Sequence, residues 1–371
     1  MSRLHYIGLD VHAGSIAVAV ADDEGVRVLG KIEHDIPKLK KLLARVGPPA
    51  SLRLVYEAGP TGFGLCRGLR GDGYVCEVIA PSLVPHRPGD RVKTDRRDAC
   101  GLAELSRGGL LQAVVVPEPE REALRDLVRA RESAKAWEKK ARQQLDKFLL
   151  RHDRRPRDKM TKWTHKHMAW VRAQTFTDPT QQLVLNEYLI ELEHQEQRVQ
   201  RFDTSLEEAA ARLPEVTQKV IHALTALKGI RFLSAVSLVA ELGDLMRFGH
   251  PTQLMSFAGV VPREHSTGDS VRRGSITKCG NTHVRRIVGE AAWAYSRERA
   301  AASKVVRSRR EGLSAQVVQI AERADQRLHK RYWWLLKRGK ATNKAVTAVA
   351  RELLGFVWAV GVQTQMEQAA A

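Results

Sequence analysis

Four acidic residues carry the clearest chemistry in this sequence: Asp10, Glu57, Asp95 and Asp98. Asp10 and Glu57 each follow directly after a short apolar run with the composition of a strand. Asp95 and Asp98 are three positions apart, so a helix would present both carboxylates on one face. Converging carboxylates repel each other unless cations neutralise them, and hard oxygen ligands select Mg²⁺ or Mn²⁺. The set therefore predicts a site for two divalent ions, about 4 Å apart, that is suited to phosphodiester chemistry.

Each acid also has a purely structural interpretation. An Asp after a strand is often a turn former, Asp95 could cap a helix, and Asp98 could pair with a nearby arginine. A strand that ends in Asp also opens the actin and sugar-kinase ATPases, whose next turn needs small and hydroxyl residues at the phosphates. Here Val11-His12-Ala13 follow Asp10, and the glycines after Glu57 do not match G-x-G-x-x-G. The strand–strand–helix order of the four acids favours the metal site.

A second group of reactive side chains lies in the segment 257–286, which is rich in Gly, Ser and Arg. Its hydroxyl candidates are Ser266, Thr267 and Ser270. The candidate nucleic-acid-binding cations around them are Arg263, Arg272, Arg273, Lys278, Arg285 and Arg286. The segment could be a loop that grips phosphate. A hydroxyl beside cations could also attack a phosphodiester if a base or metal helps to remove its proton.

The charge balance is the main feature of the composition. The chain of 371 residues has 61 Lys and Arg against 42 Asp and Glu, a net charge of +19 and a pI near 10.1. Such a field attracts polyanions, and neutralising phosphates releases counterions, which drives sequence-independent binding. A ribosome-associated or otherwise basic protein would have the same balance. Composition therefore favours nucleic-acid contact without defining the activity.

The sequence predicts neither export nor a membrane span. The chain starts in a strand pattern rather than in a charged and then apolar leader, and no apolar run has the length expected to cross a bilayer. The cysteines form no CxxC pair, which predicts reduced thiols and no structural zinc. They are Cys66, Cys76, Cys100 and Cys279. We therefore expect an intracellular protein.

The first third of the sequence has the element order of an RNase H-like domain. Three strands, a helix, a strand, a helix and a strand are predicted at 5–10, 15–21, 25–32, 36–46, 52–56, 62–70 and 74–79. A helix at 95–105 and a short strand at 111–116 follow. In this fold the first and fourth strands are adjacent and carry acids at their ends. A doubly wound Rossmann sheet would need a helix directly after the first strand, and none is predicted there.

Two long, highly charged segments with almost no Gly or Pro follow, at 119–152 and 181–213. Their apolar residues recur at spacings of three and four, which is typical of helices that bury one stripe. With the basic segment 151–166 between them, they predict a helical hairpin or coiled-coil arm. A solvated helical linker is the alternative, but isolated helices of this length need a partner for their apolar stripe.

The remainder of the chain is predicted to be mainly helical. Leu227-Lys228-Gly229-Ile230 precedes an apolar helix at 232–242, a pattern similar to a helix-hairpin-helix element that can grip a phosphate. We therefore expect three domains. They are an α/β domain at 1–117, a helical connector at 118–213 and a mainly α domain at 214–371.

Four motifs together resemble the DEDD insertion-sequence transposases, also called bridge-RNA-guided recombinases (the IS one-ten family and its eleven-eleven branch). They are GLD at 8–10, YEAGPTG at 56–62, KTDRRDA at 93–99, and the block AGVVP…STG…GSITKCGN…RR at 258–286. The resemblance covers nearly the whole chain in the right order and is weakest in the helical middle. It implies a RuvC-like N-terminal domain, a coiled-coil connector and a C-terminal transposase domain with a catalytic serine.

The resemblance also implies roles for single residues. The Mg²⁺-binding (or Mn²⁺-binding) tetrad would consist of Asp10, Glu57, Asp95 and Asp98. The family's serine lies just before a glycine, and that place reads Ser266-Thr267-Gly268 in this sequence. We assign the nucleophile to Ser266. Thr267 occupies the serine position in a gapless count, and Ser270 is a further alternative.

The implied activity is DNA recombination guided by a structured noncoding RNA that pairs with donor and target DNA. The tetrad and the serine would come from different subunits of a homodimer or tetramer. The protein would be cytoplasmic, and associated with the bacterial nucleoid when bound to DNA. Two rivals remain. A RuvC-like junction endonuclease would use the tetrad with water and leave the serine block without a purpose. A non-catalytic RNA-binding protein on a decayed RNase H scaffold would not need all four acids.

Overall fold

A computed structural model of the protein describes residues 3–85, 94–156, 159–267, 270–297 and 303–370. The chain divides into two compact units, Met1–Pro117 and Glu118–Ala371, which we call unit 1 and unit 2 and describe separately. Unit 1 is a mixed α/β sheet domain and unit 2 is mainly helical, as the sequence predicts. The finer division into three domains stays a prediction.

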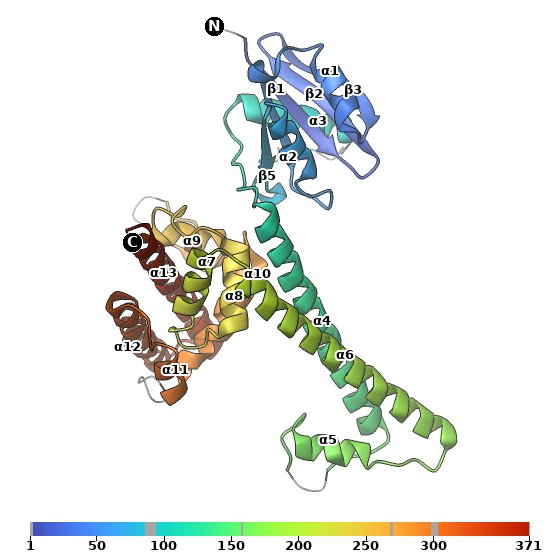
Figure 1. Cartoon of the computed structure of the whole chain (residues 1–371), viewed down its shortest axis with the longest axis vertical. Helices are drawn as coiled ribbons and strands as arrows, with labels where there is room; N and C mark the ends of the chain where they lie inside the picture. Colours follow the sequence, from blue (N-terminus) through green and yellow to red (C-terminus); the bar gives the residue numbers. More distant parts are fainter. Residues whose placement is uncertain (1–2, 86–93, 157–158, 268–269, 298–302, 371) are drawn as a thin grey trace. The chain divides into compact units, whose positions relative to one another are not determined.

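Unit 1 contains a five-stranded sheet in the order β3-β2-β1-β4-β5 (Figure 1). Strands β1 to β3 form an antiparallel meander, whereas β4 runs parallel to β1 and β5 runs parallel to β4. The predicted adjacency of the first and fourth strands is confirmed, because Leu9 pairs with Tyr56. The elements are β1 (His5–Val11), β2 (Ser15–Asp22), β3 (Gly25–Glu33), α1 (Ile36–Leu43), β4 (Leu52–Glu57), α2 (Gly64–Gly71), β5 (Val75–Ile79) and α3 (Asp95–Arg107).

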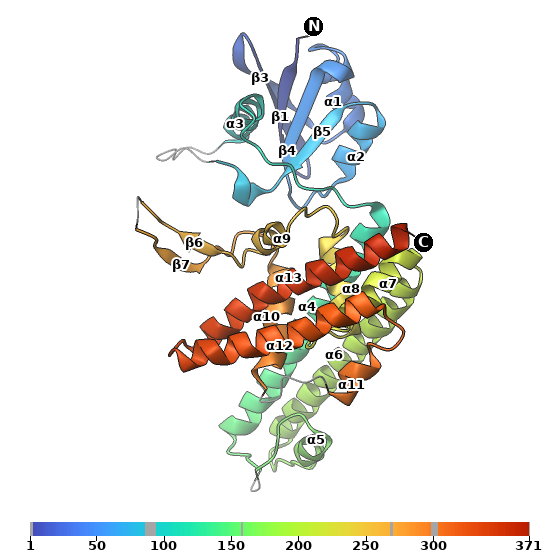
Figure 2. The ribbon, with the colours of Figure 1, turned by 90° about the vertical axis from the view of Figure 1, so that its left-hand side faces the viewer.

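The two faces of this sheet pack differently. One face carries large aliphatic side chains such as Ile7 and Leu9, which join α1 and α2 in the main core of unit 1. The opposite face is built from small residues, including Ala17 and Ala19, and α3 packs on it through Ala99. Figure 2 shows α3 on one side of the sheet and α2 on the other. Small side chains on both surfaces allow α3 to lie close to the strands.

The prediction of a short strand at 111–116 is wrong. In the described part of unit 1, this segment makes a single isolated bridge, between Ala113 and Ile79. The Val114 amide donates to the Val78 carbonyl at 2.7 Å, which attaches the segment to the edge of β5. The next bond of such a ladder would join the Val116 amide to the Cys76 carbonyl, but that carbonyl accepts from Arg70 Nε at 2.8 Å and from Cys66 Sγ instead.

Unit 2 begins with two long helices, α4 (Pro119–Arg151) and α6 (Pro179–Ala211), which pack side by side as an arm (Figure 1). They run antiparallel, since Arg131 pairs with Asp203 and Arg142 pairs with Glu196. The chain between them contains a short helix, α5 (His165–Arg172), which the sequence did not predict. A small aromatic and aliphatic cluster, including Phe148, holds α5 against the far end of the arm.

The rest of unit 2 is a helical body with one β-hairpin. Its elements are α7 (Glu215–Leu224), α8 (Phe232–Leu242), α9 (Pro251–Phe257), β6 (Pro262–Glu264), β7 (Arg273–Ile276), α10 (Thr282–Ala292), α11 (Lys304–Ser308), α12 (Ala315–Lys337) and α13 (Thr342–Ala369). Residues Leu124 and Leu206 of the arm belong to the same buried cluster as these helices. The base of the arm and the helical body therefore share one core.

Helix α13 corrects the expectation that no apolar run is long enough to cross a bilayer. It has 28 residues and a mean hydropathy of 1.6 over its most apolar window, and half of that window is buried inside the protein. Val349, Leu353 and Val357 are among its fully buried positions. They pack in the core with α7, α9, α10 and α12, so the apolar character of α13 is explained by its central place in unit 2.

Candidate active site

Asp10 and Glu57 lie at the same edge of the unit 1 sheet. Leu9 pairs with Tyr56 on the adjacent parallel strands, so the next residues, Asp10 and Glu57, are level with each other. Leu9 and Tyr56 are fully buried in the core on the α1 and α2 side. Because successive side chains of a strand point to opposite faces, both acids are directed to the face that α3 covers.

Helix α3 starts with the other two predicted acids. Thr94 is its N-cap, and its hydroxyl oxygen accepts from the Arg97 amide at 3.4 Å. Asp95 is therefore the first helical residue rather than the cap, and Asp98 lies in the same first turn. Negative charge is favourable at this end of a helix because the free amides and the helix dipole are positive there.

A glycine in β1 brings the start of α3 close to Asp10. A Cβ atom at Gly8 would lie 2.0 Å from the Ala99 carbonyl oxygen and 2.6 Å from the Ala103 amide nitrogen. No side chain fits between the strand and the helix at this point. Gly8 is two residues before Asp10 and therefore on the same face of β1. The glycine of the GLD motif thus permits the contact that positions Asp95 and Asp98.

Three side chains converge at the start of α3, namely those of Asp10, His12 and Asp95. One donor atom from each of Asp10, His12 and Asp95 can be chosen so that all lie within 4.8 Å of one another. His12 Nε2 is 3.2 Å from Asp10 Oδ2 and 3.6 Å from Asp95 Oδ1. Lys31 Nζ is 2.7 Å from Asp95 Oδ2. Two carboxylates and an imidazole nitrogen are a donor set that can hold a divalent ion.

The charges of this cluster oppose one another. Burial raises the pKa of Asp10, the charges of Asp95 and Asp98 raise it further, and His12 acts in the opposite direction. The pKa of Asp95 is lowered, chiefly by its hydrogen bond from Lys31, with His12 adding to the effect. A cation at this point would relieve the repulsion, so the residues present fit a divalent metal ion.

The structure brings together only part of the predicted tetrad. Glu57 is at the same sheet edge, and Asp98 acts on Asp10 through its charge. Neither belongs to the mutually close set formed by Asp10, His12 and Asp95. Their assignment as metal ligands therefore stays a prediction.

His12 and Lys31 were not predicted as site residues. His12 is two positions after Asp10 and extends the same alternation, which is a signal that the sequence offered. The position of Lys31 beside the site depends on the pairing of three strands. Asp10 on β1 pairs with Ala17 on β2, and Ala17 pairs with Lys31 on β3. A small residue in the middle of this row leaves room for the lysine to reach Asp95.

The hydroxyl candidates lie on the β6–β7 hairpin of unit 2 (Figure 2). Ser266 is exposed, and its Oγ donates to Glu264 Oε1 at 2.9 Å. Arg273 Nε also lies 3.3 Å from Glu264. The bond from Ser266 and then that from Arg273 lower the pKa of Glu264. Thr267 and Ser270 pair through their backbones, and Gly268 of the Ser-Thr-Gly motif lies outside the described residues.

Two glycines fix the base of this hairpin. Gly259 and Gly280 both have positive φ, and a Cβ atom on either would lie within 2.4 Å of a carbonyl oxygen from the opposite chain segment. The Lys278 amide donates to the Gly259 carbonyl at 3.0 Å, and the Asn281 amide donates to the Phe257 carbonyl at 2.8 Å. The AGVVP and CGN motifs thus cross at one point, from which the hairpin extends.

The six predicted phosphate-binding cations fall into two groups. Four are exposed side chains on or beside the hairpin: Arg263, Arg272, Arg273 and Lys278. The other two hold the protein together. Arg285 Nη1 donates to the Ala258 carbonyl at 2.8 Å, and Arg286 pairs with Glu132 and Glu290. A nucleic-acid role for any of the six stays a prediction.

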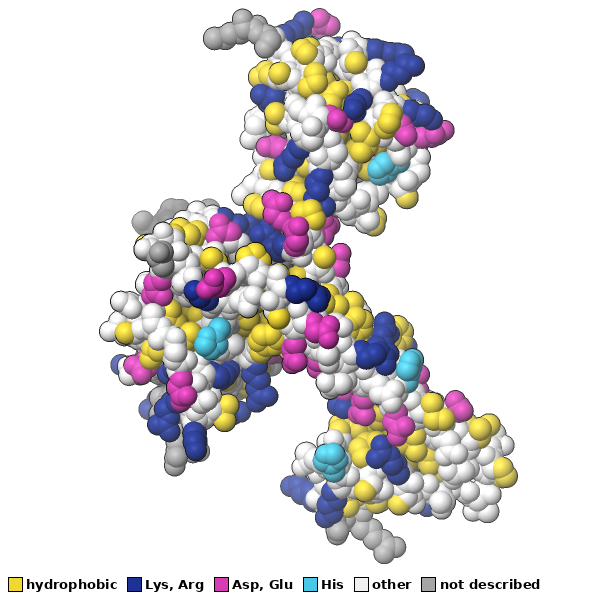
Figure 3. Space-filling view, in the orientation of Figure 1, with side chains coloured by type: hydrophobic (Ala, Val, Ile, Leu, Met, Phe, Trp, Pro, Cys, Tyr) yellow, Lys and Arg dark blue, Asp and Glu magenta, His cyan; other side chains and the backbone are white. Residues whose placement is uncertain are grey.

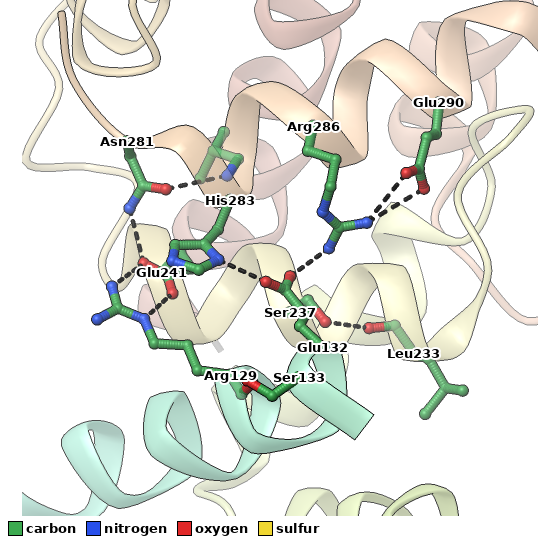
Figure 4. A network of polar contacts seen from close by, with 11 residues as sticks. Arg129, Glu132, Ser133, Leu233, Ser237, Glu241, Asn281, His283, Arg286 and Glu290 are labelled. Atoms are coloured by element: carbon green, nitrogen blue, oxygen red, sulfur yellow. Dashed lines mark hydrogen bonds and ion pairs between the residues drawn. The ribbon is translucent and has the colours of Figure 1, made fainter. Parts of the chain in front are cut away.

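Beneath the hairpin, a polar network joins α4, α8 and α10 (Figure 4). The side chain of Glu241 is completely buried, and Arg129 holds it with two bonds of 2.8 and 3.0 Å. Asn281 Nδ2 donates to the same carboxylate at 2.7 Å while its oxygen caps α10 by accepting from the Val284 amide. On the outer side, His283 and Arg286 contact Glu132. The network fastens the end of the hairpin to the arm.

Comparison with known proteins identifies the class of protein that carries these features. A family model described as "Transposase IS116/IS110/IS902 family" matches residues 221–307, which include the hairpin and its base. A DEDD transposase model of the IS110 type matches residues 7–152, which include the acidic edge and α3. The class is therefore a transposase, an enzyme that recombines DNA.

Individual relatives agree over most of their length. The chain is 41% identical to the y4qE protein of Sinorhizobium fredii over 362 residues, covering 96% of this chain and 88% of the relative. It is 31% identical to the transposase for insertion sequence element IS1533 of Leptospira borgpetersenii, covering 90% and 96%. It is 25% identical to the transposase for insertion sequence element IS1111A of Coxiella burnetii, covering 79% and 73%. The chain belongs to the IS116/IS110/IS902 family of insertion-sequence transposases.

Proposed function

We propose that this transposase recombines DNA through a metal ion held at the Asp10 edge of unit 1 and a hydroxyl nucleophile on the β6–β7 hairpin of unit 2. The observation that carries the proposal is the convergence of Asp10, His12 and Asp95, which the close packing of α3 on Gly8 produces. Structural carboxylates are normally paired with cations or separated. Here Lys31 pairs with Asp95 and His12 contacts Asp10, yet the two acids still lie close enough to share one ion.

The fold of unit 1 supports an RNase H-like, RuvC-like catalytic domain. Its strand order, its antiparallel first three strands and its parallel fourth and fifth strands agree with the order predicted for that fold. We infer that Asp10, Glu57, Asp95 and Asp98 are the DEDD tetrad and that the ion is Mg²⁺ or Mn²⁺. His12 is a further ligand at the same place, and Lys31 orients the Asp95 carboxylate.

A bound divalent ion would polarise the oxygens of the phosphate that is transferred. The protein's own part is to supply and orient the nucleophile. Ser266 Oγ forms a bond to phosphorus and gives up its proton, while the bond from phosphorus to the leaving deoxyribose oxygen breaks and that oxygen takes up a proton. Glu264 accepts a hydrogen bond from the hydroxyl and so orients it. A DNA hydroxyl then attacks the phosphoserine and restores Ser266.

The partners that we propose are donor and target DNA and a structured noncoding RNA that pairs with both. A net charge of +19 is suited to a protein that holds two polyanions. The arm formed by α4 and α6 would act as a coiled-coil connector that assembles a homodimer or tetramer. In that assembly, the acidic edge of one subunit and the hairpin of another would act on one phosphate.

Covalent trapping tests this proposal. Protein, the RNA transcribed from the flanks of its element, and DNA carrying the element's ends are incubated with Mg²⁺, denatured, and examined for a protein–DNA adduct. We expect an adduct that Ser266→Ala abolishes and that Thr267→Ala and Ser270→Ala retain. Loss in Thr267→Ala or Ser270→Ala alone would move the nucleophile to that residue. DNA cleavage without any adduct would favour hydrolysis by water, as in a junction endonuclease.

A further inference from the structure

One face of α4 carries a row of exposed side chains suited to nucleic acid. Trp137, Lys140, Gln144, Lys147 and Arg151 follow one another at spacings of three and four, so they line a single face of the helix, and all five are exposed. We call these residues the α4 row. Its span from Trp137 to Arg151 is roughly 21 Å at the rise of an α-helix.

Several cations of the arm and of the chain between its two helices are already paired with carboxylates, unlike those of the α4 row. Lys135, Arg142, Lys162 and Arg172 each pair with a carboxylate. Figure 3 shows Lys and Arg side chains beside Asp and Glu along the visible face of the arm. Within the described ranges of the chain, Lys140, Lys147 and Arg151 have no carboxylate oxygen within 4.0 Å. Their charge is therefore not neutralised by the protein.

A hollow of about 520 Å³ opens beside this row. Half-buried Tyr188 supplies an aromatic wall, whereas Phe148 borders the hollow with only 3% of its surface exposed. Gln143 and Gln144 supply amide groups that can both donate and accept hydrogen bonds. Lys140, Lys147 and Arg151 also line it. The hollow thus combines aromatic surface, two-way hydrogen-bonding groups and unneutralised cations in one place. A nucleotide offers a partner for all three features, because it has an aromatic ring, a polar base edge and a charged phosphate.

We propose that the hollow binds an unpaired nucleotide of an RNA loop, with the base against Tyr188 and the flanking phosphates on the cations of the α4 row. Base–aromatic stacking contributes about 1–3 kcal/mol for each base, and the glutamine amides can bond the polar edge of the base. The exposed Trp137, whose ring already lies 4.6 Å from Lys140 Nζ, offers a second stacking surface at the end of the row.

The choice of RNA over DNA rests on the proposed function, in which the DNA partners are duplexes and the guide is a folded RNA. Bases of a duplex are paired and stacked, so they cannot enter a hollow without being extruded. Loops of a folded RNA present unpaired bases that stack on aromatic side chains and expose their edges. The α4 row and the hairpin cations belong to different elements of unit 2, so separate variants can test the two surfaces.

The test compares two charge-matched variants of the full-length protein. The first, Lys147→Gln with Arg151→Gln, removes two cations that line the hollow. The second, Lys162→Gln with Arg172→Gln, removes two ion-paired cations from the chain between α4 and α6. Binding is measured with a short RNA hairpin that has an unpaired loop, with the DNA hairpin of the same sequence, and with a blunt RNA duplex. A 4-thiouridine in the loop allows crosslinks to be mapped.

We expect the first variant to bind the RNA hairpin at least about tenfold more weakly and to lower the slope of log affinity against log salt by about 1.4. The second variant changes the affinity less than about threefold, and crosslinks map to the peptide with Tyr188. Equal losses in both variants, no loss in the first, or crosslinks elsewhere would overturn the proposal. Equal binding of the DNA hairpin would overturn the choice of RNA. If the wild-type protein binds no RNA yet transposes DNA, RNA guidance itself fails, which is a different result.

Discussion

The acidic edge of unit 1 and the hydroxyl hairpin of unit 2 are built in opposite ways. At the acidic edge, α3 packs so closely on β1 that no side chain fits at Gly8, and the carboxylates are placed by the backbone. On the hairpin, Ser266 and its neighbours are exposed and contact mainly one another. Only the base of the hairpin is held firmly, by the crossing at Gly259 and Gly280 and by the buried Glu241 network.

The difference fits the roles that we propose for the two regions. Metal ligands must keep a fixed geometry, and rigid elements locked by packing provide it. A nucleophile that meets DNA must be accessible, and a hairpin on a firm base provides access without losing its direction. Changes at the acidic edge should therefore affect stability and chemistry together, whereas changes on the hairpin should affect chemistry alone.

The largest effect is expected for Asp10→Asn, which removes the acid on which the cluster depends. Strand transfer should fall by about 10²–10³-fold, as happens when one preorganised electrostatic group is lost from a reacting site. The control is Asp23→Asn, an acid of the same unit whose side chain is 84% exposed. If Asp10→Asn keeps full activity in a Mg²⁺-dependent assay, the acidic edge does not take part in the reaction.

Arg129→Met tests the polar network beneath the hairpin. It leaves the buried Glu241 carboxylate without its main partner, which should cost about 3–5 kcal/mol in urea unfolding of unit 2. The control is Arg327→Met, whose side chain is 68% exposed and should contribute less than about 1 kcal/mol. A cost as small as that of the control would show that the network does not hold the hairpin base.

Arg129→Met should also reverse how the ionisation of Glu241 affects the stability of the protein as the pH falls. Burial raises the pKa of Glu241, but the bonds from Arg129 and Asn281 outweigh it, so the pKa is lowered in the folded protein. A lowered carboxyl pKa contributes stability above the unfolded pKa, and this is lost as pH falls through the folded pKa. Without Arg129, burial dominates and the pKa rises, so the deficit of the variant should shrink as pH falls. A deficit independent of pH would contradict this account.

Gly8→Ala tests the close packing of α3. The added methyl group would meet the backbone of α3, which should cost about 1–3 kcal/mol of stability and lower strand transfer by displacing Asp95. Gly14→Ala is the matched control, since nothing lies within 4 Å of a Cβ atom there, and it should change stability by less than about 0.5 kcal/mol. Equal behaviour of the two variants in thermal unfolding would contradict the packing argument.

His12→Ala tests whether the imidazole is a ligand. We expect about tenfold weaker Mn²⁺ binding, measured by calorimetry or electron paramagnetic resonance. His5→Ala is a suitable control, because His5 begins the same strand and pairs with Asp22 instead. An unchanged Mn²⁺ affinity in His12→Ala would leave the metal to the carboxylates alone.

The smallest effect on stability is expected for Ser266→Ala. Its hydroxyl is exposed and makes one bond to an exposed carboxylate, so unfolding should change by less than about 0.5 kcal/mol. A large destabilisation, seen as a lower Tm, would assign Ser266 a structural role. Unchanged stability together with a lost covalent adduct would sharpen the contrast with Gly8.

The sequence predicted those parts of the structure that depend on local pattern. The strands β1 and β4 of unit 1 are short apolar runs, so the positions of Asp10 and Glu57 at their ends followed from the residues. The long helices of the arm have a periodicity that no strand shares. The family motifs then indicated that the acids and the hydroxyl segment belong to one site. Local sequence patterns could not show this, because the two lie far apart in the sequence.

What the sequence did not predict depends on pairing between distant residues. Lys31 reaches the site through two strand pairings, and Asp95 meets Asp10 and His12 because α3 packs on β1. The hairpin β6–β7 is short, polar and exposed, so it lacks the apolar alternation that marks a strand. Helix α13 is apolar because it is central in unit 2, a fact that appears only in the packing.

Mixing two inactive variants tests most directly whether the acidic edge and the hairpin act together on one phosphate. Asp10→Asn and Ser266→Ala proteins are each assayed alone for strand transfer and then after being unfolded and refolded together. If the two halves come from different subunits, each variant alone is inactive and the mixture regains a fraction of wild-type activity, with the covalent DNA on the Asp10→Asn chain. A mixture as inactive as its components would contradict a site shared between subunits, and activity of either variant alone would contradict the pairing of acid and serine.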